Sequence, residues 1–170
     1  MLPEYQLLHT KLHNNRLFLY NYAAELNFSG HYEESQSVAR ECERFWADYD
    51  LQMLQANNYE QLKDYPNAEQ CYRKAAVMCP VKFMPLYSLA KMYDETGRSS
   101  EAVALAEKIV RKTVKIPSPN IIAIQQKMRQ LIQREAENDS VYQPITENLP
   151  SNHRQGHTPN VQPSDAALPP

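Results

Sequence analysis

Two histidines near the amino terminus have a spacing that suits a metal ion. His9 and His13 lie four residues apart, so on a helix they share one face. Such a pair can bind zinc, but the residues between them supply no glutamate that would act as a base. His153 and His157 repeat the spacing in a segment where no site would be preformed. We therefore interpret His9 and His13 as surface or packing residues and predict no metal site.

The three cysteines do not form a disulfide framework, because their number is odd and small. Cys71 and Cys79 are eight residues apart on one expected helix, about 12 Å along its axis, and cannot pair without unwinding it. We interpret Cys42, Cys71 and Cys79 as small apolar residues that are buried.

Paired carboxylates occur at Asp48 and Asp50 and at Asp94 and Glu95. Such pairs carry out acid–base catalysis only where a cleft perturbs their pKa, and we interpret them instead as solvated helix ends. No serine or cysteine nucleophile stands in a recognisable arrangement with a histidine, although such groups can meet in space alone. We predict no catalytic residue and no cofactor, and a small enzyme with an unrecognised cleft remains the less expected alternative.

Composition describes an ordinary globular chain. Of 170 residues, 42% are apolar, and the formal net charge is -2. A charge so close to zero gives no electrostatic reason to expect nucleic acid or an anionic membrane as partner. No apolar run is long enough to span a bilayer, and the first residues do not resemble a signal peptide. Taken alone, the chain is expected to be cytoplasmic if it is complete.

Apolar periodicity predicts helices from the amino terminus to position 138. The expected helices span residues 4–28, 31–47, 49–62, 65–79, 83–96, 99–114 and about 119–137. The polar tripeptide at 13–15 interrupts the first, which is therefore one long helix or two. The second carries Phe45 and Trp46 in its apolar stripe. On the last, Ile121, Ile124, Met128, Leu131 and Ile132 share one side, and Gln125, Lys127, Arg129, Gln130 and Arg134 share the other.

One pattern occurs twice between positions 49 and 114, and its second copy follows the first at a constant interval. The pairs at this interval are Ala56 and Ala90, Tyr59 and Tyr93, and Ala68 and Ala102. A fixed period of about 34 residues is typical of a repeated helix–turn–helix unit. The alanines would let neighbouring helices approach closely, and the tyrosines would fill the gaps between layers. We therefore predict an all-α array of three helix pairs, closed by a helix that caps the stack.

These residues resemble the tetratricopeptide repeat family. The unit at 49–82 matches it at Ala56, Tyr59, Ala68, Tyr72, Ala75 and Pro80, and the unit at 83–116 matches at Leu86, Leu89, Ala90, Tyr93, Gly97 and Ala102. A degenerate unit covers about 16–48 and has Ser35 where alanine is usual. Gln52, Gln55 and Ala106 also depart from the family pattern. The resemblance implies a scaffold for protein–protein interaction.

A second resemblance is narrower. The run CYRKAAVMCPVKFMPLYSLAKMYDETG and the later segment KIPSPNIIAIQQKMRQLI are similar to the carboxy-terminal repeat region of a bacterial O-antigen ligase family. That resemblance implies a link to surface-polysaccharide assembly and a membrane-bound parent or partner. It also implies a periplasmic location if the chain is a detached domain of a membrane protein. The membrane part that carries the ligase chemistry is absent, so no catalytic residue is implied here.

Helix A of each pair lines the concave face in tetratricopeptide arrays, which implies a groove for a peptide or helix of a partner protein. The register places Tyr20, Asn27, Met53, Asn57, Tyr87, Lys91 and Asp94 in that groove, together with Ala24 and Glu60. Only Asn57 and Lys91 fit the family's carboxylate clamp, so a chaperone carboxyl terminus is not the expected ligand. A structural spacer or self-association module without a peptide ligand is the alternative.

The composition changes after position 138. Six of the 12 prolines fall between positions 139 and 170, among asparagine, serine, glutamine and histidine. A segment of this kind cannot bury enough apolar surface to offset the entropy lost on ordering. We predict a repeat domain at 1–138 and a disordered tail at 139–170.

Overall fold

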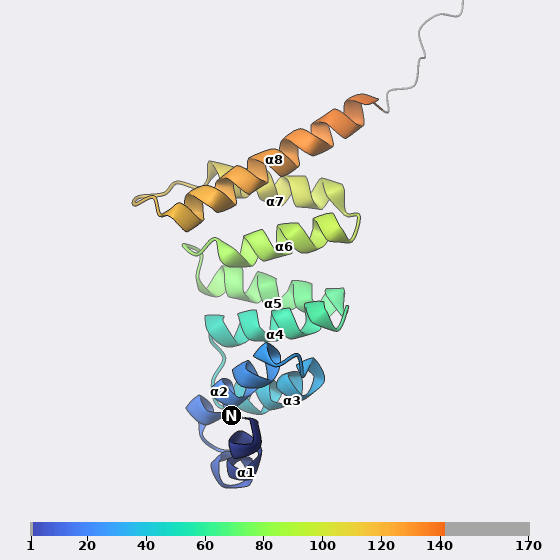
Figure 1. Ribbon diagram of the computed structural model, residues 1–170. Coiled ribbons are helices and arrows are strands. Elements are labelled where there is room, and N and C mark those ends of the chain that lie inside the picture. The colour runs from blue at the N-terminus through green and yellow to red at the C-terminus, as the bar shows by residue number, and fades with distance from the viewer. Residues whose placement is uncertain (1, 142–170) are drawn as a thin grey trace, which may run out of the picture.

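The chain folds into a curved stack of helices, seen in a computed structural model that describes residues 2–141 (Figure 1). The helices are α1 (Leu2–Leu12), α2 (Arg16–Phe28), α3 (Tyr32–Glu43), α4 (Tyr49–Gln61), α5 (Tyr65–Met78), α6 (Met84–Glu95), α7 (Ser99–Arg111) and α8 (Pro119–Val141). No strand occurs in this range. The predicted all-α repeat array is confirmed, with antiparallel hairpins α2–α3, α4–α5 and α6–α7 stacked in chain order. The predicted tail lies outside the described residues, apart from the last turn of α8.

Local sequence signals set where several of these helices start or stop. Asn15, Asp48 and Asp64 cap α2, α4 and α5, because each side chain accepts a hydrogen bond from a backbone N–H of the first turn. Gly30 and Gly97 have φ of 81° and 75° in the turns after α2 and α6. Glycine adopts this left-handed conformation without steric penalty, so both turns are tight.

The interruption predicted at 13–15 separates α1 from α2. Helix α1 packs across α2 through stacked rings of Tyr5 and Tyr22, whose centroids are 5.3 Å apart. The helix expected at 31–47 was predicted too long, because α3 ends at Glu43. Its last turn closes when the backbone N–H groups of Phe45 and Trp46 both bond the carbonyl of Cys42. These two aromatic side chains are therefore outside the core and about half exposed.

The alanines of the repeat lie where the helices meet. Ala56, Ala68, Ala75, Ala90 and Ala102 are completely buried. Tyr72 and Tyr93 are buried beside them, as the repeat pattern predicts. A methyl group at each contact lets two backbones approach closely, and the aromatic rings fill the space between successive hairpins.

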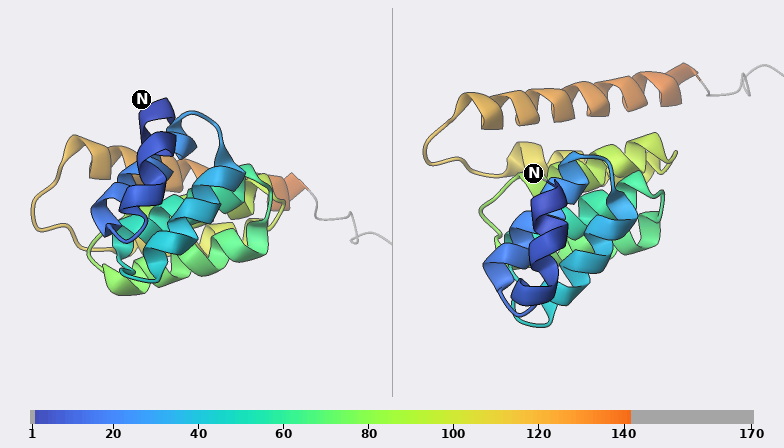
Figure 2. Two further views of the ribbon diagram at one scale, coloured as in Figure 1. Left: turned by 90° about the horizontal axis from the view of Figure 1, so that it is seen from below. Right: turned by 60° about the horizontal axis from the view of Figure 1, so that its bottom comes forward.

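Helix α8 covers the last hairpin, running alongside α7 and extending past the stack at its carboxyl end (Figures 1 and 2). Its apolar side packs as predicted, with Met128 and Leu131 buried in the core. Gln125 was assigned wrongly to the solvent side. Its Nε2 donates to the carbonyls of Ile109 (3.2 Å) and Lys112 (3.3 Å), so it satisfies acceptors left open at the end of α7.

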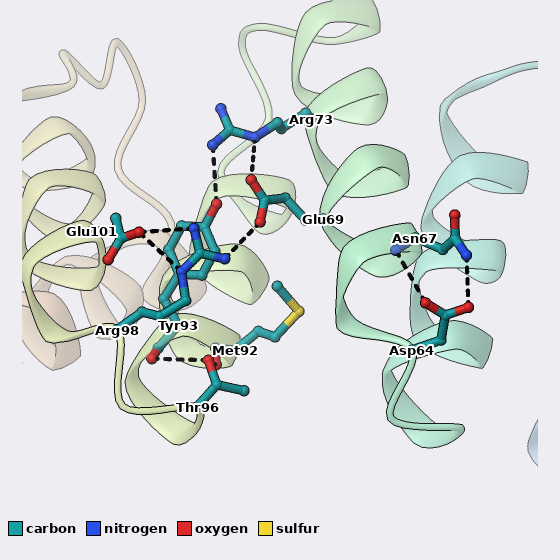
Figure 3. Close-up of polar contacts among 9 residues, drawn as sticks. All are labelled: Asp64, Asn67, Glu69, Arg73, Met92, Tyr93, Thr96, Arg98 and Glu101. Atoms are coloured by element: carbon teal, nitrogen blue, oxygen red, sulfur yellow. Dashed lines mark hydrogen bonds and ion pairs between the residues drawn. The ribbon is translucent and has the colours of Figure 1, made fainter.

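A polar junction joins α5, α6 and the start of α7 (Figure 3). Glu69 accepts hydrogen bonds from Arg73 Nε (2.9 Å) and from Arg98 (2.8 Å), while Arg73 also donates to the hydroxyl of Tyr93 (3.0 Å). Burial alone would raise the pKa of Glu69, but hydrogen bonds from Tyr93, Arg98 and Arg73 outweigh it and lower the pKa to about 2.

We predict that Ala90→Leu destabilises the stack by about 1–3 kcal/mol, because the larger side chain overpacks a contact with no free space. Urea unfolding followed by circular dichroism measures the change. The control is Ala136→Leu at an exposed position of α8, which should leave the midpoint unchanged. Equal stability of the two variants would contradict the close contact at Ala90.

We also predict that Glu69→Gln lowers stability by about 1–2 kcal/mol at pH 7, through loss of charge-assisted hydrogen bonds. The pKa of Glu69 is lower in the folded state than its ordinary value of 4.5. The stabilisation that the Glu69 carboxylate gives to the folded state is therefore complete above pH 4.5 and is lost as the pH falls toward 2. Thermal unfolding between pH 7 and pH 2 should show the native and variant curves converging in acid. A difference in stability between the native chain and the variant that stays constant across that range would contradict the lowered pKa of Glu69.

Candidate partner-binding groove

The side chains predicted to line the concave face lie on the first helix of each hairpin, and each is at least partly exposed. Tyr20 and Asn27 lie on α2, Met53 and Asn57 on α4, and Tyr87, Lys91 and Asp94 on α6. The structure brings these residues together in subsets rather than in one continuous site.

Three of them line a groove of about 460 Å³ between α6 and α8, which we call the α6–α8 groove. Tyr87, Lys91 and Asp94 form its α6 wall, together with Glu95. The α8 wall consists of Lys127, Met128, Gln130, Leu131 and Arg134. Tyr87 and Lys127 also line an adjoining cavity of about 250 Å³ toward the start of α8, so both cavities meet at these two side chains.

The charged groups of the groove are arranged in pairs. Lys91 lies 3.1 Å from Glu95 on the next turn of α6, and Arg134 of α8 pairs with Asp94. The hydrogen bond with Glu95 raises the pKa of Lys91. An acidic group of a partner would therefore compete with carboxylates already in place, and an apolar or aromatic group would contact Tyr87 without that competition.

The α8 wall was not identified as part of the groove from the sequence. Lys127, Gln130 and Arg134 were expected to face water on the outer side of the capping helix. Their spacing of three and four residues does place them on one helical face, next to the stripe that contains Met128 and Leu131. Only the angle at which α8 crosses the stack decides that this face borders α6.

Asn27 and Asn57 are joined directly. Asn27 Nδ2 lies 2.7 Å from Asn57 Oδ1 and 2.8 Å from Oδ1 of Asn58, whose side chain is fully buried. Asn58 in turn donates to Ser35 Oγ at 2.8 Å, and Ser35 donates to the carbonyl of Ala23 at 2.7 Å. These bonds connect α2, α3 and α4, so they hold the two surface asparagines in a defined position.

This chain of bonds belongs to a larger polar seam between α3 and α4. Its buried members are Ser35, Gln36, Gln52, Gln55 and Asn58. Gln52 and Gln55 each donate to the carboxylate of Glu43 at 3.1 Å. The departures from the repeat pattern at Ser35, Gln52 and Gln55 thus have one structural reason, since all three contribute to the same junction. Glu43 and Asn58 carried no signal in the sequence that set them apart.

Tyr20 lies apart from both groups. It lines a cavity of about 250 Å³ with Arg16, Leu17, Cys42, Trp46, Asp48 and Asp50. Burial raises the pKa of the Tyr20 phenol, and the charges of Asp50 and Asp48 add to that shift. Met53 packs against the larger apolar cluster and keeps part of its side chain exposed.

The two amino-terminal histidines have separate partners. His9 Nε2 lies 2.9 Å from Glu41 on α3, and its ring packs edge-on against Tyr22. His13, in the turn after α1, bonds the carbonyl of Thr10 in the last turn of that helix. Residues 2–141 contain no group of three or more potential ligands that could hold a metal ion. None of the helices in this range is long and apolar enough to cross a membrane.

Comparison with known families agrees with the hairpin geometry. Residues 49–80, which form α4 and α5, match the family model of the tetratricopeptide repeat. The match supports the resemblance of this chain to the tetratricopeptide repeat family. Repeats of this family generally mediate protein–protein interactions and are typically scaffolds rather than enzymes. Comparison with curated proteins gave no match, so the narrower resemblance to an O-antigen ligase family has no relative to support it.

We predict that Asn58→Ala lowers stability by about 1–3 kcal/mol, because it removes a buried side chain that is hydrogen-bonded to Asn27, Ser35 and Gln36. Urea unfolding measures this loss. Asn57→Ala is the matched control, since Asn57 makes one bond to the same Asn27 from a partly exposed position. A loss in the control as large as that in Asn58→Ala would contradict the central place of Asn58 in the seam.

Proposed function

We propose that this chain is a non-catalytic scaffold that binds an extended segment of a partner protein along its concave face, with the α6–α8 groove as the main anchoring site. The observation that supports the proposal is the groove itself, which has walls on two helices, apolar side chains at its base and charged groups along its rim. This arrangement suits a peptide whose aromatic or aliphatic side chain enters the groove beside Tyr87. Asn27 and Asn57 would then offer amide groups to the backbone of the same segment.

Tyr87 is the residue from which we expect the largest contribution. It is partly buried, borders both cavities and presents a large, rigid ring, which is the usual character of an interface anchor. Lys127 lies beside it on α8 and supplies a positive charge that a carboxylate of the partner would approach. Binding would therefore combine an apolar anchor with one charged contact.

The wider setting rests on sequence resemblance alone. A role as the soluble repeat region of an O-antigen-ligase-like surface-polysaccharide system follows from the runs in α5 to α8 that are similar to that family. The reading frame upstream of Met1 tests this setting. A set of membrane spans encoded there would support it, and an unrelated reading frame would remove it.

The groove is tested by selecting ligands from a random peptide library displayed on phage, with the full chain as bait. Calorimetric titration then compares the selected peptides on native and variant chains. We expect Tyr87→Ala to weaken binding by about 2 kcal/mol, and Lys91→Glu or Lys127→Glu to weaken it less. Circular dichroism should show unchanged helicity.

Lys74→Glu is the control, because this exposed lysine lies on α5, the second helix of its hairpin. If Lys74→Glu weakened peptide binding as much as the groove variants, that result would argue against binding at the concave face. If no peptide is selected, a structural spacer or self-association module becomes the better account, and light scattering over a concentration series would distinguish these two.

A further inference from the structure

The loops that join one hairpin to the next lie on one edge of the stack. They are residues 44–48, 79–83 and 112–118, and Figure 1 shows all three on the left-hand side. The topology requires this arrangement, because successive helices are antiparallel and α3 to α7 have similar lengths. We call these three segments the loop edge. The turns within the hairpins, at 29–31, 62–64 and 96–98, lie on the opposite edge.

Large apolar side chains project from the loop edge. Val81 is 81% exposed and Ile116 is 83% exposed, while Phe45 and Trp46 are each 46% exposed. Leu17, which is also exposed, lines the same cavity as Trp46. Single exposed apolar residues are common on protein surfaces, but a set gathered along one edge indicates a contact surface.

The same loops are basic, although the chain as a whole has a net charge of -2. They contain Arg44, Lys82, Lys112 and Lys115 against a single acidic residue, Asp48. The carboxylate of Asp48 is occupied, since it caps α4 and accepts a hydrogen bond of 2.6 Å from the indole of Trp46. The near-neutral total therefore conceals a positive edge.

Lys112 links two of the three loops. Its Nζ donates to the carbonyls of Pro80 (2.5 Å) and Lys82 (3.0 Å), which ties the second and third loops together. Burial lowers the pKa of Lys112, and the neighbouring charge of Lys108 lowers it further. Asp50 lies 3.8 Å from Lys82 and offsets its charge, and Glu107 pairs with Arg111 at 2.7 Å, so the uncompensated charge of the loop edge comes from Arg44, Lys112 and Lys115.

We propose that the loop edge binds the surface of an anionic phospholipid membrane. Trp46 and Phe45 would lie at the depth of the headgroups, Val81 and Ile116 would enter the acyl boundary, and the basic side chains would contact lipid phosphates. Aromatic residues favour this interface, and lysine and arginine are attracted to anionic lipids. The helices would stand end-on to the bilayer, so the α6–α8 groove, which lies along the helices, would stay accessible.

Trp46 provides a direct measurement, because it is the only tryptophan in the chain. The full chain is mixed with vesicles of phosphatidylcholine alone, or with about 30% phosphatidylglycerol added as anionic lipid. We expect co-sedimentation and a blue shift of Trp46 emission with anionic vesicles, and neither effect with neutral ones. Raising the salt concentration to about 0.5 M should weaken binding strongly, since the attraction is screened.

Two matched pairs of variants test the location. Val81→Glu with Ile116→Glu, and separately Lys115→Glu, should each weaken vesicle binding at least about tenfold. Their controls lie at the opposite edge: Phe28→Glu, where the ring is 90% exposed, and Lys63→Glu. Both controls should bind as the native chain does. All these positions are exposed, so helicity should not change.

Three results would overturn the proposal. The first is native chain that does not sediment with anionic vesicles at low salt. The second is a loss of vesicle binding in the opposite-edge controls that equals the loss in the loop-edge variants. The third is soluble poly-glutamate shifting Trp46 emission while anionic vesicles do not, which would assign the edge to an acidic polypeptide. None of the loop-edge variants alters the α6–α8 groove, so peptide binding there succeeds or fails independently.

Discussion

Close contact between helix backbones is the constraint on which the rest of this structure depends. It is possible only where side chains are small, and the buried alanines at 56, 68, 90 and 102 meet that condition at corresponding places in successive hairpins. Larger groups between them, such as Tyr72 and Tyr93, then fill a space of fixed size. Because each hairpin leaves an apolar face that only its neighbour covers, the stack needs the α8 cap at its end.

The core is not uniform along the stack. One apolar cluster includes residues of α2, α3 and the start of α4, and a second runs from α4 to α8. The polar seam lies between them, where Gln52, Gln55 and Asn58 replace apolar packing with hydrogen bonds. Such bonds stabilise only when their geometry is right, and a partly satisfied network is unfavourable. The Oε1 atom of Gln52 is buried without a hydrogen-bond partner among the described residues, which marks this junction as the less optimised one.

Two surfaces of different character result from the same stacking. The α6–α8 groove has one wall on α6 and the other in the middle of α8, and Lys91 and Arg134 are already paired with Glu95 and Asp94 within it. The loop edge is built from the segments between hairpins, where large apolar side chains are exposed and basic residues outnumber acidic ones. A scaffold with these two surfaces could hold a partner segment in the groove while the loop edge contacts a membrane, since the two do not overlap.

The sequence by itself determined the order and approximate bounds of the helices, the period of the repeat and the buried alanines, because these depend on spacing within one segment. It also placed Tyr87, Lys91 and Asp94 together on α6, since residues three and four apart share a helical face. Only the tertiary structure decided that α8 forms the opposite wall, that Asn27 meets Asn57 and Asn58, and that distant loops form one basic, apolar edge. Each of these depends on contacts between residues far apart in the chain, and their geometry follows from the packing angle and number of helices rather than from any local pattern.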